Sequence, residues 1–419
     1  MKVKTILLLI FFLIFIQAKA MYILIPMDDV QKDHLKSYGI AYWTLQRDIE
    51  VKWLLNYRGG SFLIQHFAEI ENECIVRGVT YENIADAQAD AILTEIARPD
   101  MNQDAVAMNK APKIAVYSPP NKQPWDDAVT LVLTYAEIDY DVIYDEEILS
   151  GKLSEYDWLH LHHEDFTGQH GKFWHSYAHM PWYQEEVKIN NDLAKKLGFM
   201  KVSEMKSFVT REIEKYVTNG GFLFAMCAAT DTYDISLAAA GIDICQPMFD
   251  GDPMDPDLDA HLDFKRTFAF ENFKLVKDPN VYEFSNIDAT ETRRVVREND
   301  YFTLFDFSAK WDPIPTMLCQ NHKNLVKGFM GQTTAYRKEV LKSNVLVMGD
   351  NKPANEARYI HGEKGRGFWT FYGGHDPEDY RHLIGDPPTD LSLHPNSPGY
   401  RLILNNVLFP AAKKKKRKT

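Results

Sequence analysis

The chain has 419 residues, an apolar content of 45% and a formal net charge of −12. This length is too great for one small domain and suits two. The negative charge repels phosphate backbones, which argues against nucleic acid as the main partner.

The first twenty residues have the features of a secretory signal peptide. Lys2 and Lys4 give a positive start, residues 6–16 form an apolar run, and residues 18–20 (Ala-Lys-Ala) supply a small-x-small cleavage site. The apolar run reaches only about half of the ~20 residues that a membrane-spanning helix needs. We therefore expect export to the periplasm or the medium, cleavage after Ala20, and no transmembrane segment.

Residues 21–110 alternate between strand-like and helix-like patterns, which predicts a small N-terminal α/β domain of the βαβ type. The expected strands are 22–25, 51–57 and 79–84, and the expected helices are 34–45, 70–77 and 86–97. The polar stretch 98–112 that follows indicates a linker.

Residues 111–412 predict a second, larger domain. Its expected strands are 114–117, 140–144, 158–162, 222–226, 345–348 and 368–372, and its expected helices are 125–137, 208–217, 231–240 and 400–408. Apolar strands that alternate with amphipathic helices are typical of a doubly wound, mostly parallel sheet, whose functional residues follow the carboxyl ends of the strands. The segments 163–206 and 246–340 are too long for plain connections, so we expect them to form lids over that edge.

Charge and cysteine content add two expectations. Residues 413–419 form a basic tail, which we interpret as a solvated end, with contact to an anionic surface as the alternative. Four cysteines are few for an exported chain, so the core rather than disulfides should stabilise the fold. Cys245 and Cys319 flank one inserted segment and could pair.

Cys227 is a candidate catalytic nucleophile. It follows the apolar strand 222–226 and precedes small residues and a helix, an arrangement typical of a nucleophile elbow. In such a turn the sulfur points out of the sheet, backbone N–H groups near Ala228 can hold an oxyanion, and the helix N-terminus near Asp231 favours the thiolate. The alternative is an inert buried cysteine at a strand end.

A second candidate group follows the strand 368–372. The sequence Gly-Gly-His-Asp-Pro-Glu at 373–378 places His375 just beyond a strand end, at the same edge as Cys227 if the sheet is parallel. His375 could take the thiol proton, and Asp376 or Glu378 could orient the imidazole. The candidates for contact with a substrate are Ala228, Asp231, Gly373 and Gly374. The alternative is a surface loop whose histidine caps the next helix.

The cysteine elbow and the late histidine and glutamate resemble the class I glutamine amidotransferases. The G-R-G and G-H-D-P motifs of Gly365–Glu378 look like the ThuA-like branch of that superfamily. The resemblance covers about residues 112–410 and implies a flavodoxin-like, glutamine amidotransferase-like fold and a Cys-dependent amide or acyl hydrolase. Departures from the family pattern are Pro377 in the place of the glutamate, and Met226 and Ala228 where the family has glycines.

The whole chain is similar to exported bacterial proteins that carry the name asparagine synthetase B. Neither the S-G-G-x-D-S loop of asparagine synthetases nor a P-loop occurs in the sequence. We therefore do not expect ATP-dependent asparagine synthesis.

Residues 160–179 hold six of the 14 histidines of the chain. So many imidazoles could bind zinc, and the candidate ligands are His160, His162, His163 and His170. No H-E-x-x-H or comparable spacing is present. The alternative is an aromatic-rich lid whose histidines are polar lining, without any cofactor.

Three functions therefore remain open. The first is an amide or acyl hydrolase with Cys227 as nucleophile and a small-molecule amide as substrate. The second is a non-catalytic envelope protein that binds a sugar or a protein partner in the same cleft, because aromatic faces stack on sugar rings. The third is a zinc-dependent hydrolase centred on the histidine-rich segment.

Overall fold

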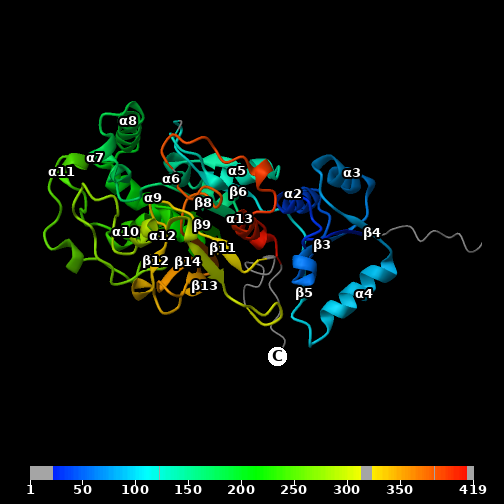
Figure 1. The fold of residues 1–419 in the computed structure, drawn as a ribbon. Coiled ribbons are helices and arrows are strands. Elements are labelled where there is room, and N and C mark those ends of the chain that lie inside the picture. The colour runs from blue at the N-terminus through cyan, green and yellow to red at the C-terminus, as the bar shows by residue number, and fades with distance from the viewer. Residues whose placement is uncertain (1–21, 122, 313–322, 382, 413–419) are drawn as a thin grey trace, which may run out of the picture.

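The computed structural model describes residues 22–412 apart from 122, 313–322 and 382 (Figure 1). The expected signal peptide, the basic tail and Cys319, the expected partner of Cys245, lie outside the described residues. Within the described ranges, Cys74, Cys227 and Cys245 are free thiols, and no helix is both long and apolar enough to cross a membrane.

The N-terminal part is a five-stranded sheet in the order β4-β1-β3-β2-β5, and every pair in it is antiparallel. Its strands are β1 (Tyr22–Ile25), β2 (Val51–Leu55), β3 (Ser61–Gln65), β4 (Glu82–Ile84) and β5 (Asp104–Met108). Its helices are α2 (His34–Leu45), α3 (Ala68–Arg77) and α4 (Asp86–Ala97).

The expected βαβ arrangement is therefore wrong for this part. Asn56, Gly59 and Gly60 all have positive φ and reverse the chain, so β2 forms a hairpin with β3, a strand that was not expected from the sequence. Part of the expected linker is the edge strand β5, which pairs with β2 through its whole length.

The larger sheet has ten strands in the order β11-β10-β13-β14-β15-β9-β8-β6-β7, and β12 pairs with β14. Its first strands are β6 (Ile114–Tyr117), β7 (Asp141–Ile143), β8 (Trp158–Leu161) and β9 (Phe222–Met226). The others are β10 (Tyr301–Leu304), β11 (Leu325–Lys327), β12 (Tyr336–Arg337), β13 (Leu346–Asn351), β14 (Glu356–Lys364) and β15 (Gly367–Tyr372).

The predicted doubly wound, mostly parallel, flavodoxin-like sheet is wrong, because this sheet is mixed. Only the neighbours β15, β9, β8, β6 and β7 run parallel, whereas β10 to β14 extend the sheet in antiparallel pairs. The sequence analysis did not predict β14, since Glu356, Arg358 and His361 lie in it. These side chains are buried, and Arg358 pairs with Asp300 at 2.9 Å inside the protein.

Helices cover the parallel half of this sheet on both faces (Figure 1). They are α5 (Ala128–Tyr135), α6 (Asp145–Leu149), α9 (Val202–Thr218), α10 (Ala229–Ala238) and α13 (Pro398–Leu408). Phe222 and Phe224 of β9 pack in one core with α5 and α13, whereas Leu223 and Ala225 pack in the other with α9 and α10. Burial of both faces explains why β9 is apolar throughout.

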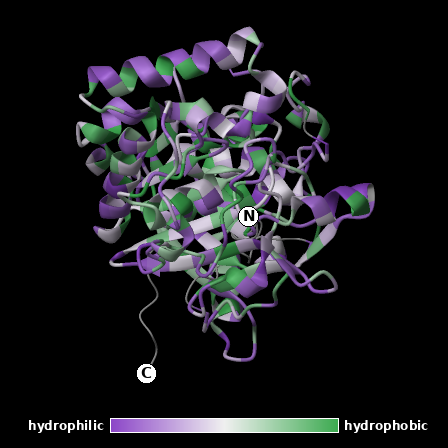
Figure 2. Ribbon diagram, turned by 90° about the vertical axis from the view of Figure 1, so that its left-hand side faces the viewer, coloured by the Kyte–Doolittle hydropathy of each residue, from purple (hydrophilic) through white to green (hydrophobic). Residues whose placement is uncertain are grey.

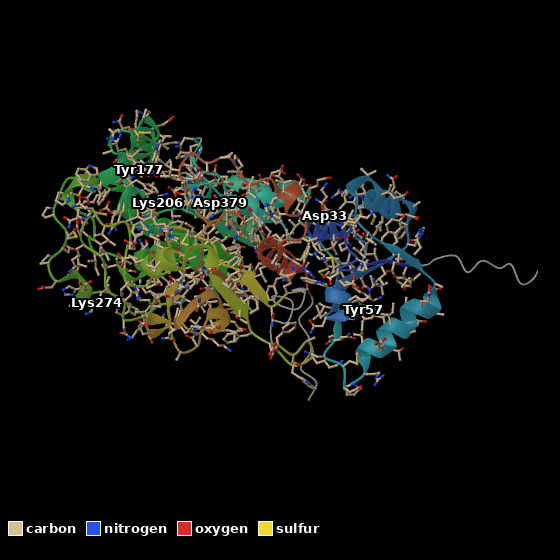
Figure 3. All side chains as sticks on the ribbon, in the orientation of Figure 1. Asp33, Tyr57, Tyr177, Lys206, Lys274 and Asp379 are labelled. Atoms are coloured by element: carbon tan, nitrogen blue, oxygen red, sulfur yellow. The ribbon has the colours of Figure 1, made fainter. Side chains whose placement is uncertain are left out.

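The helices of the inserted segments lie at the end of the molecule away from the N-terminal sheet (Figure 1). They are α7 (Trp174–Tyr177), α8 (Pro181–Lys196), α11 (Pro247–Asp250) and α12 (Thr290–Val296). Figure 3 shows Tyr177 near this end and Tyr57 in the N-terminal part. The second segment is not only a lid, because it also supplies β10, β11 and β12 to the larger sheet, and Phe307 O accepts a hydrogen bond from Asn102 of the N-terminal part. The outer helices carry both hydrophilic and hydrophobic residues (Figure 2), as helices with one face on a core do.

The two sheets share the core that contains α5 and α13. Residues of α2 and of β1 to β3 belong to the same buried cluster as α13. Tyr38 of α2 donates its hydroxyl to Asn405 Oδ1 at 2.5 Å, and Arg401 donates to Tyr38 at 3.2 Å and to the carbonyl of Gly59. The last helix therefore binds the first helix and the first hairpin.

Candidate functional site

Four neighbouring parallel strands bring the candidate site residues to one edge of the larger sheet. Cys227 follows β9, His375 follows β15, His162 follows β8, and Asp126 lies in the loop after β6. Because β6, β8, β9 and β15 pair in parallel, their carboxyl ends meet at the same edge.

Cys227 forms a strained turn between β9 and α10. Its φ of 52° lies in the left-handed region, which costs a non-glycine residue about 1–2 kcal/mol. Hydrogen bonds hold this conformation: the N–H of Cys227 donates to Gly374 O at 3.1 Å, and its carbonyl accepts from Thr230 Oγ1 at 2.7 Å. The side chain is 3% exposed. The backbone therefore has the geometry of a nucleophile elbow.

The backbone N–H of Gln332 donates to the sulfur of Cys227 at 3.2 Å. The side chain of Gln332 is anchored in turn, because its Nε2 donates to Gly171 O at 2.8 Å and to Tyr282 O at 3.1 Å. A donor directed at sulfur favours the thiolate over the thiol. The sequence analysis missed Gln332, and because only its backbone takes part, no residue-type signal points to it.

His375 lies between Cys227 and a carboxylate. Its Nε2 is 3.6 Å from Asp126 Oδ1. Burial lowers the pKa of His375 and the neighbouring His162 lowers it too, but the carboxylate of Asp126 and the sulfur of Cys227 raise it above its usual value. Burial raises the pKa of Asp126, and the attraction of the neighbouring His375 outweighs this and holds it below its usual range.

The structure places the two expected orienting carboxylates away from this imidazole. Glu378 Oε2 lies 3.2 Å from His394 Nδ1. Asp376 accepts a hydrogen bond from the N–H of Glu378 at 2.8 Å, and its carboxylate also contacts Tyr400. Asp126 takes the position next to His375, and the sequence analysis missed it. The available signal was the Asp-Asp pair in the loop after β6.

The loop that carries Gln332 is supported by Gly373, Gly374 and Asp231, three of the residues predicted to touch a substrate. A Cβ on Gly374, which has a φ of +102°, would lie 2.4 Å from the Phe329 ring, and one on Gly373 would lie 2.4 Å from Thr334 O. Asp231 accepts a hydrogen bond from Thr333 at 2.9 Å, and burial raises the pKa of Asp231 to about 7.

Ala228 is fully buried and is the N-cap residue of α10. The next residue, Ala229, donates its N–H to the carbonyl of His162 at 2.8 Å. The start of α10 is thereby tied to the end of β8, next to the histidine-rich segment.

The four candidate metal ligands separate into three environments. His160 contacts Phe224 O and Asp127 Oδ2 through its two ring nitrogens, each at 3.2 Å. Together with Asp127 and His162 it forms a group whose potential ligand atoms lie within 4.8 Å of one another. His170 packs against Tyr183 with ring centroids 6.4 Å apart, and burial lowers its pKa to about 4.

His162 and His163 lie beside His375. The ring of His162 stacks on that of His375 with centroids 4.2 Å apart, and His163 follows at 5.9 Å. One ring nitrogen from each of these three residues lies within 4.8 Å of the others. Three imidazoles of this kind are a ligand set of catalytic zinc sites.

Aromatic residues cover this histidine cluster. The ring of Trp125 contacts those of His163, Phe173 and Trp182, with centroid distances of 5.0, 5.3 and 5.4 Å. Phe173 in turn contacts Tyr282 at 5.8 Å. Phe173 and Trp182 come from the first inserted segment, Trp125 from the loop after β6 and Tyr282 from the second inserted segment. Together these rings shield the imidazoles from water.

A cleft of about 1090 Å³ lies next to the loop that carries Gln332. Gly331 and Gln332 form part of its wall, and the N–H of Gln332 touches Cys227 Sγ. Tyr282 and the segment around α12 form another part. The cleft therefore reaches the loop that contacts the candidate nucleophile.

Comparison with known proteins assigns no family. No family model and no curated protein matches the chain. Among solved structures, a cytoplasmic protein from Salmonella typhimurium aligns over 72% of this chain and 100% of its own, with 12% identity and a TM-score of 0.35.

Two glycosidases also align with the chain. The exo-β-1,4-mannosidase Op5Man5 from Opitutaceae bacterium strain TAV5 covers 62% of this chain and 31% of its own, with 10% identity and a TM-score of 0.27. A β-galactosidase from Bacillus circulans sp. alkalophilus covers 63% of this chain and 29% of its own, with 10% identity and a TM-score of 0.25. These scores are too low to assign a shared fold or activity to the chain.

Proposed function

We propose that the protein is a hydrolase in which Cys227 attacks the acyl carbon of an amide or a related compound. The observation that carries the proposal is the strained turn at Cys227, with the Gln332 N–H on its sulfur and His375 within electrostatic reach of that sulfur. The resemblance to class I glutamine amidotransferases supports the same reaction class. Asp126 takes the role of the orienting carboxylate.

The reaction needs only water as a second substrate. The thiol proton of Cys227 moves to His375, the sulfur bonds to the acyl carbon, and the leaving group takes the proton as its bond to carbon breaks. Water then gives a proton to His375 and its oxygen to the acyl carbon. The C–S bond breaks, and the proton returns to the sulfur as the acid leaves. This route requires no ATP, which agrees with the proposed export of the protein.

Alkylation of Cys227 by iodoacetamide, followed across pH by mass spectrometry of the peptide, tests the proposal. We expect alkylation at pH 7 that is faster than that of a free cysteine and that slows in His375→Gln, because the imidazole takes the thiol proton. Slow alkylation at every pH, unchanged by that substitution, would contradict the proposal. It would favour the non-catalytic binding protein, which needs no reactive thiol.

The proximity of His162, His163 and His375 favours one second candidate, a zinc-dependent hydrolase. Both candidates use His375, so they exclude each other in the same molecule. We expect zinc loading of untagged protein to separate them. Stoichiometric zinc that disappears in His163→Gln, together with activity that a chelator removes and iodoacetamide does not, would replace the cysteine mechanism.

A further inference from the structure

The cleft next to the Gln332 loop has a charge opposite to that of the chain as a whole. Arg294, Arg297 and Arg381 line it, and among the described residues of its wall there is no aspartate or glutamate. The chain itself carries a net charge of −12. A positively charged wall concentrates anions inside the cleft, even though the protein as a whole is negatively charged.

These three arginines differ from the structural arginine next to them. Arg293 is buried and pairs with Asp300 at 3.0 Å and with Glu356 at 2.6 Å. Arg294, Arg297 and Arg381 are exposed, and within the part of the chain that the structure describes none of them takes part in an ion pair. Their guanidinium groups are therefore free to bind a ligand in the cleft.

Tyr282 connects the arginines to the sulfur. Burial raises the pKa of Tyr282, Cys227 raises it further, and Arg294 lowers it, so this side chain lies within electrostatic reach of both groups. The backbone carbonyl of Tyr282 also accepts from Gln332 Nε2 at 3.1 Å, and the N–H of Gln332 contacts the sulfur. A ligand held by the arginines would thus extend past Tyr282 towards Cys227.

We propose that this cleft binds an anionic acyl compound, with its carboxylate or phosphate group on the three arginines and its acyl carbon towards Cys227. The inference rests on the proposed function for the reaction, but the charge of the cleft is an independent observation. Guanidinium groups bind carboxylate and phosphate oxygens in a bidentate manner, which makes them suited to either group.

Alkylation by two reagents of similar size tests the proposal. Iodoacetate carries a carboxylate and iodoacetamide does not, so the ratio of their rates at Cys227 reports the potential of the cleft. We expect the ratio of the iodoacetate rate to the iodoacetamide rate to be higher at Cys227 than at free cysteine. At low ionic strength this ratio should fall about twofold in each of Arg294→Gln, Arg297→Gln and Arg381→Gln. It should fall on the order of tenfold when all three substitutions are combined. Arg98→Gln, in the N-terminal part, is the control and should keep the wild-type ratio.

A second measurement does not depend on the thiol. Calorimetry of Cys227→Ser with glutarate or with inorganic phosphate should show binding that weakens in the arginine variants, and the tighter of the two identifies the anionic group. Unreactive Cys227 with retained anion binding would refute the proposed function and leave the cleft assignment standing. The cleft assignment alone is overturned if Cys227 is reactive, the rate ratio is the same in the wild type and in all three arginine variants, and neither anion binds.

Discussion

Gln332 donates its backbone N–H to the sulfur of Cys227 at 3.2 Å, although 105 positions separate the two residues in the sequence. The elbow between β9 and α10 is therefore completed by the second inserted segment. That segment is held in place by Arg358 of β14, whose Nη2 donates to Phe329 O at 2.7 Å. The environment of the sulfur thus depends on the antiparallel half of the sheet.

We expect Asp300→Ala to destabilise the protein and to slow alkylation of Cys227. Asp300 accepts from buried Arg293 at 3.0 Å and from buried Arg358 at 2.9 Å. Its loss leaves two buried guanidinium groups without this partner, which costs about 3–5 kcal/mol. Urea unfolding measures the effect, with the exposed Asp306→Ala as control. If Asp300→Ala lowers the free energy of unfolding as little as the control does, the ion pairs of Asp300 with Arg293 and Arg358 do not stabilise the loop.

We expect Asp126→Asn, and not Glu378→Gln, to impair His375. Asp126 raises the pKa of His375, so its replacement lowers that pKa and weakens the thiolate–imidazolium pair near neutral pH. The loss in alkylation rate at pH 7 should be on the order of tenfold, which corresponds to one pKa unit. Glu378 faces His394 instead, so its variant is the matched control. Equal effects of the two substitutions would refute the assignment of Asp126.

The buried carboxyl group of Asp231 should make stability fall as the pH rises. Burial raises its folded-state pKa to about 7 from a usual value of 3.8. Between these values the folded state retains a proton that the unfolded state loses, so unfolding becomes easier as the pH rises towards 7. Between pH 5 and pH 8 the wild type should lose about 2–3 kcal/mol of unfolding free energy that Asp231→Asn does not lose.

Urea unfolding of the wild type and Asp231→Asn at both pH values measures this difference. The exposed Asp90→Asn, on α4, should leave the pH dependence as in the wild type. Parallel stability curves for the wild type and Asp231→Asn would show that this carboxyl group does not titrate with folding.

The strain at Cys227 predicts that glycine, compared with alanine, changes the stability in opposite directions at Cys227 and at Cys74. Cys227 has a φ of 52°, so Cys227→Gly should be more stable than Cys227→Ala by about 1 kcal/mol. Cys74 lies inside the helix α3, where glycine should be less stable than alanine by about 1 kcal/mol. Thermal or urea unfolding of the four variants compares them directly. The same order at both sites would mean that the turn is not strained.

The positions of Cys227 and His375 could be predicted because each follows an apolar strand with its own local signal. Asp126 lies in an irregular loop, and its place beside His375 depends on the parallel pairing of strands far apart in the sequence. Gln332 contributes a backbone atom, which no residue type reveals. Strand β14 in the antiparallel half of the sheet was missed for a related reason, since Arg358 is polar in the sequence but paired and buried in the fold.

The bond between Tyr38 and Asn405 joins segments 367 positions apart. Contacts of this sequence separation form late, because the chain between them must first be ordered. The face of the N-terminal sheet that packs on α2 can therefore close only when α13 is present, whereas the opposite face packs on α4 within the N-terminal part itself. During synthesis the first of these faces stays incomplete until the last helix has been made, and a chain truncated before Arg401 should leave it unpacked.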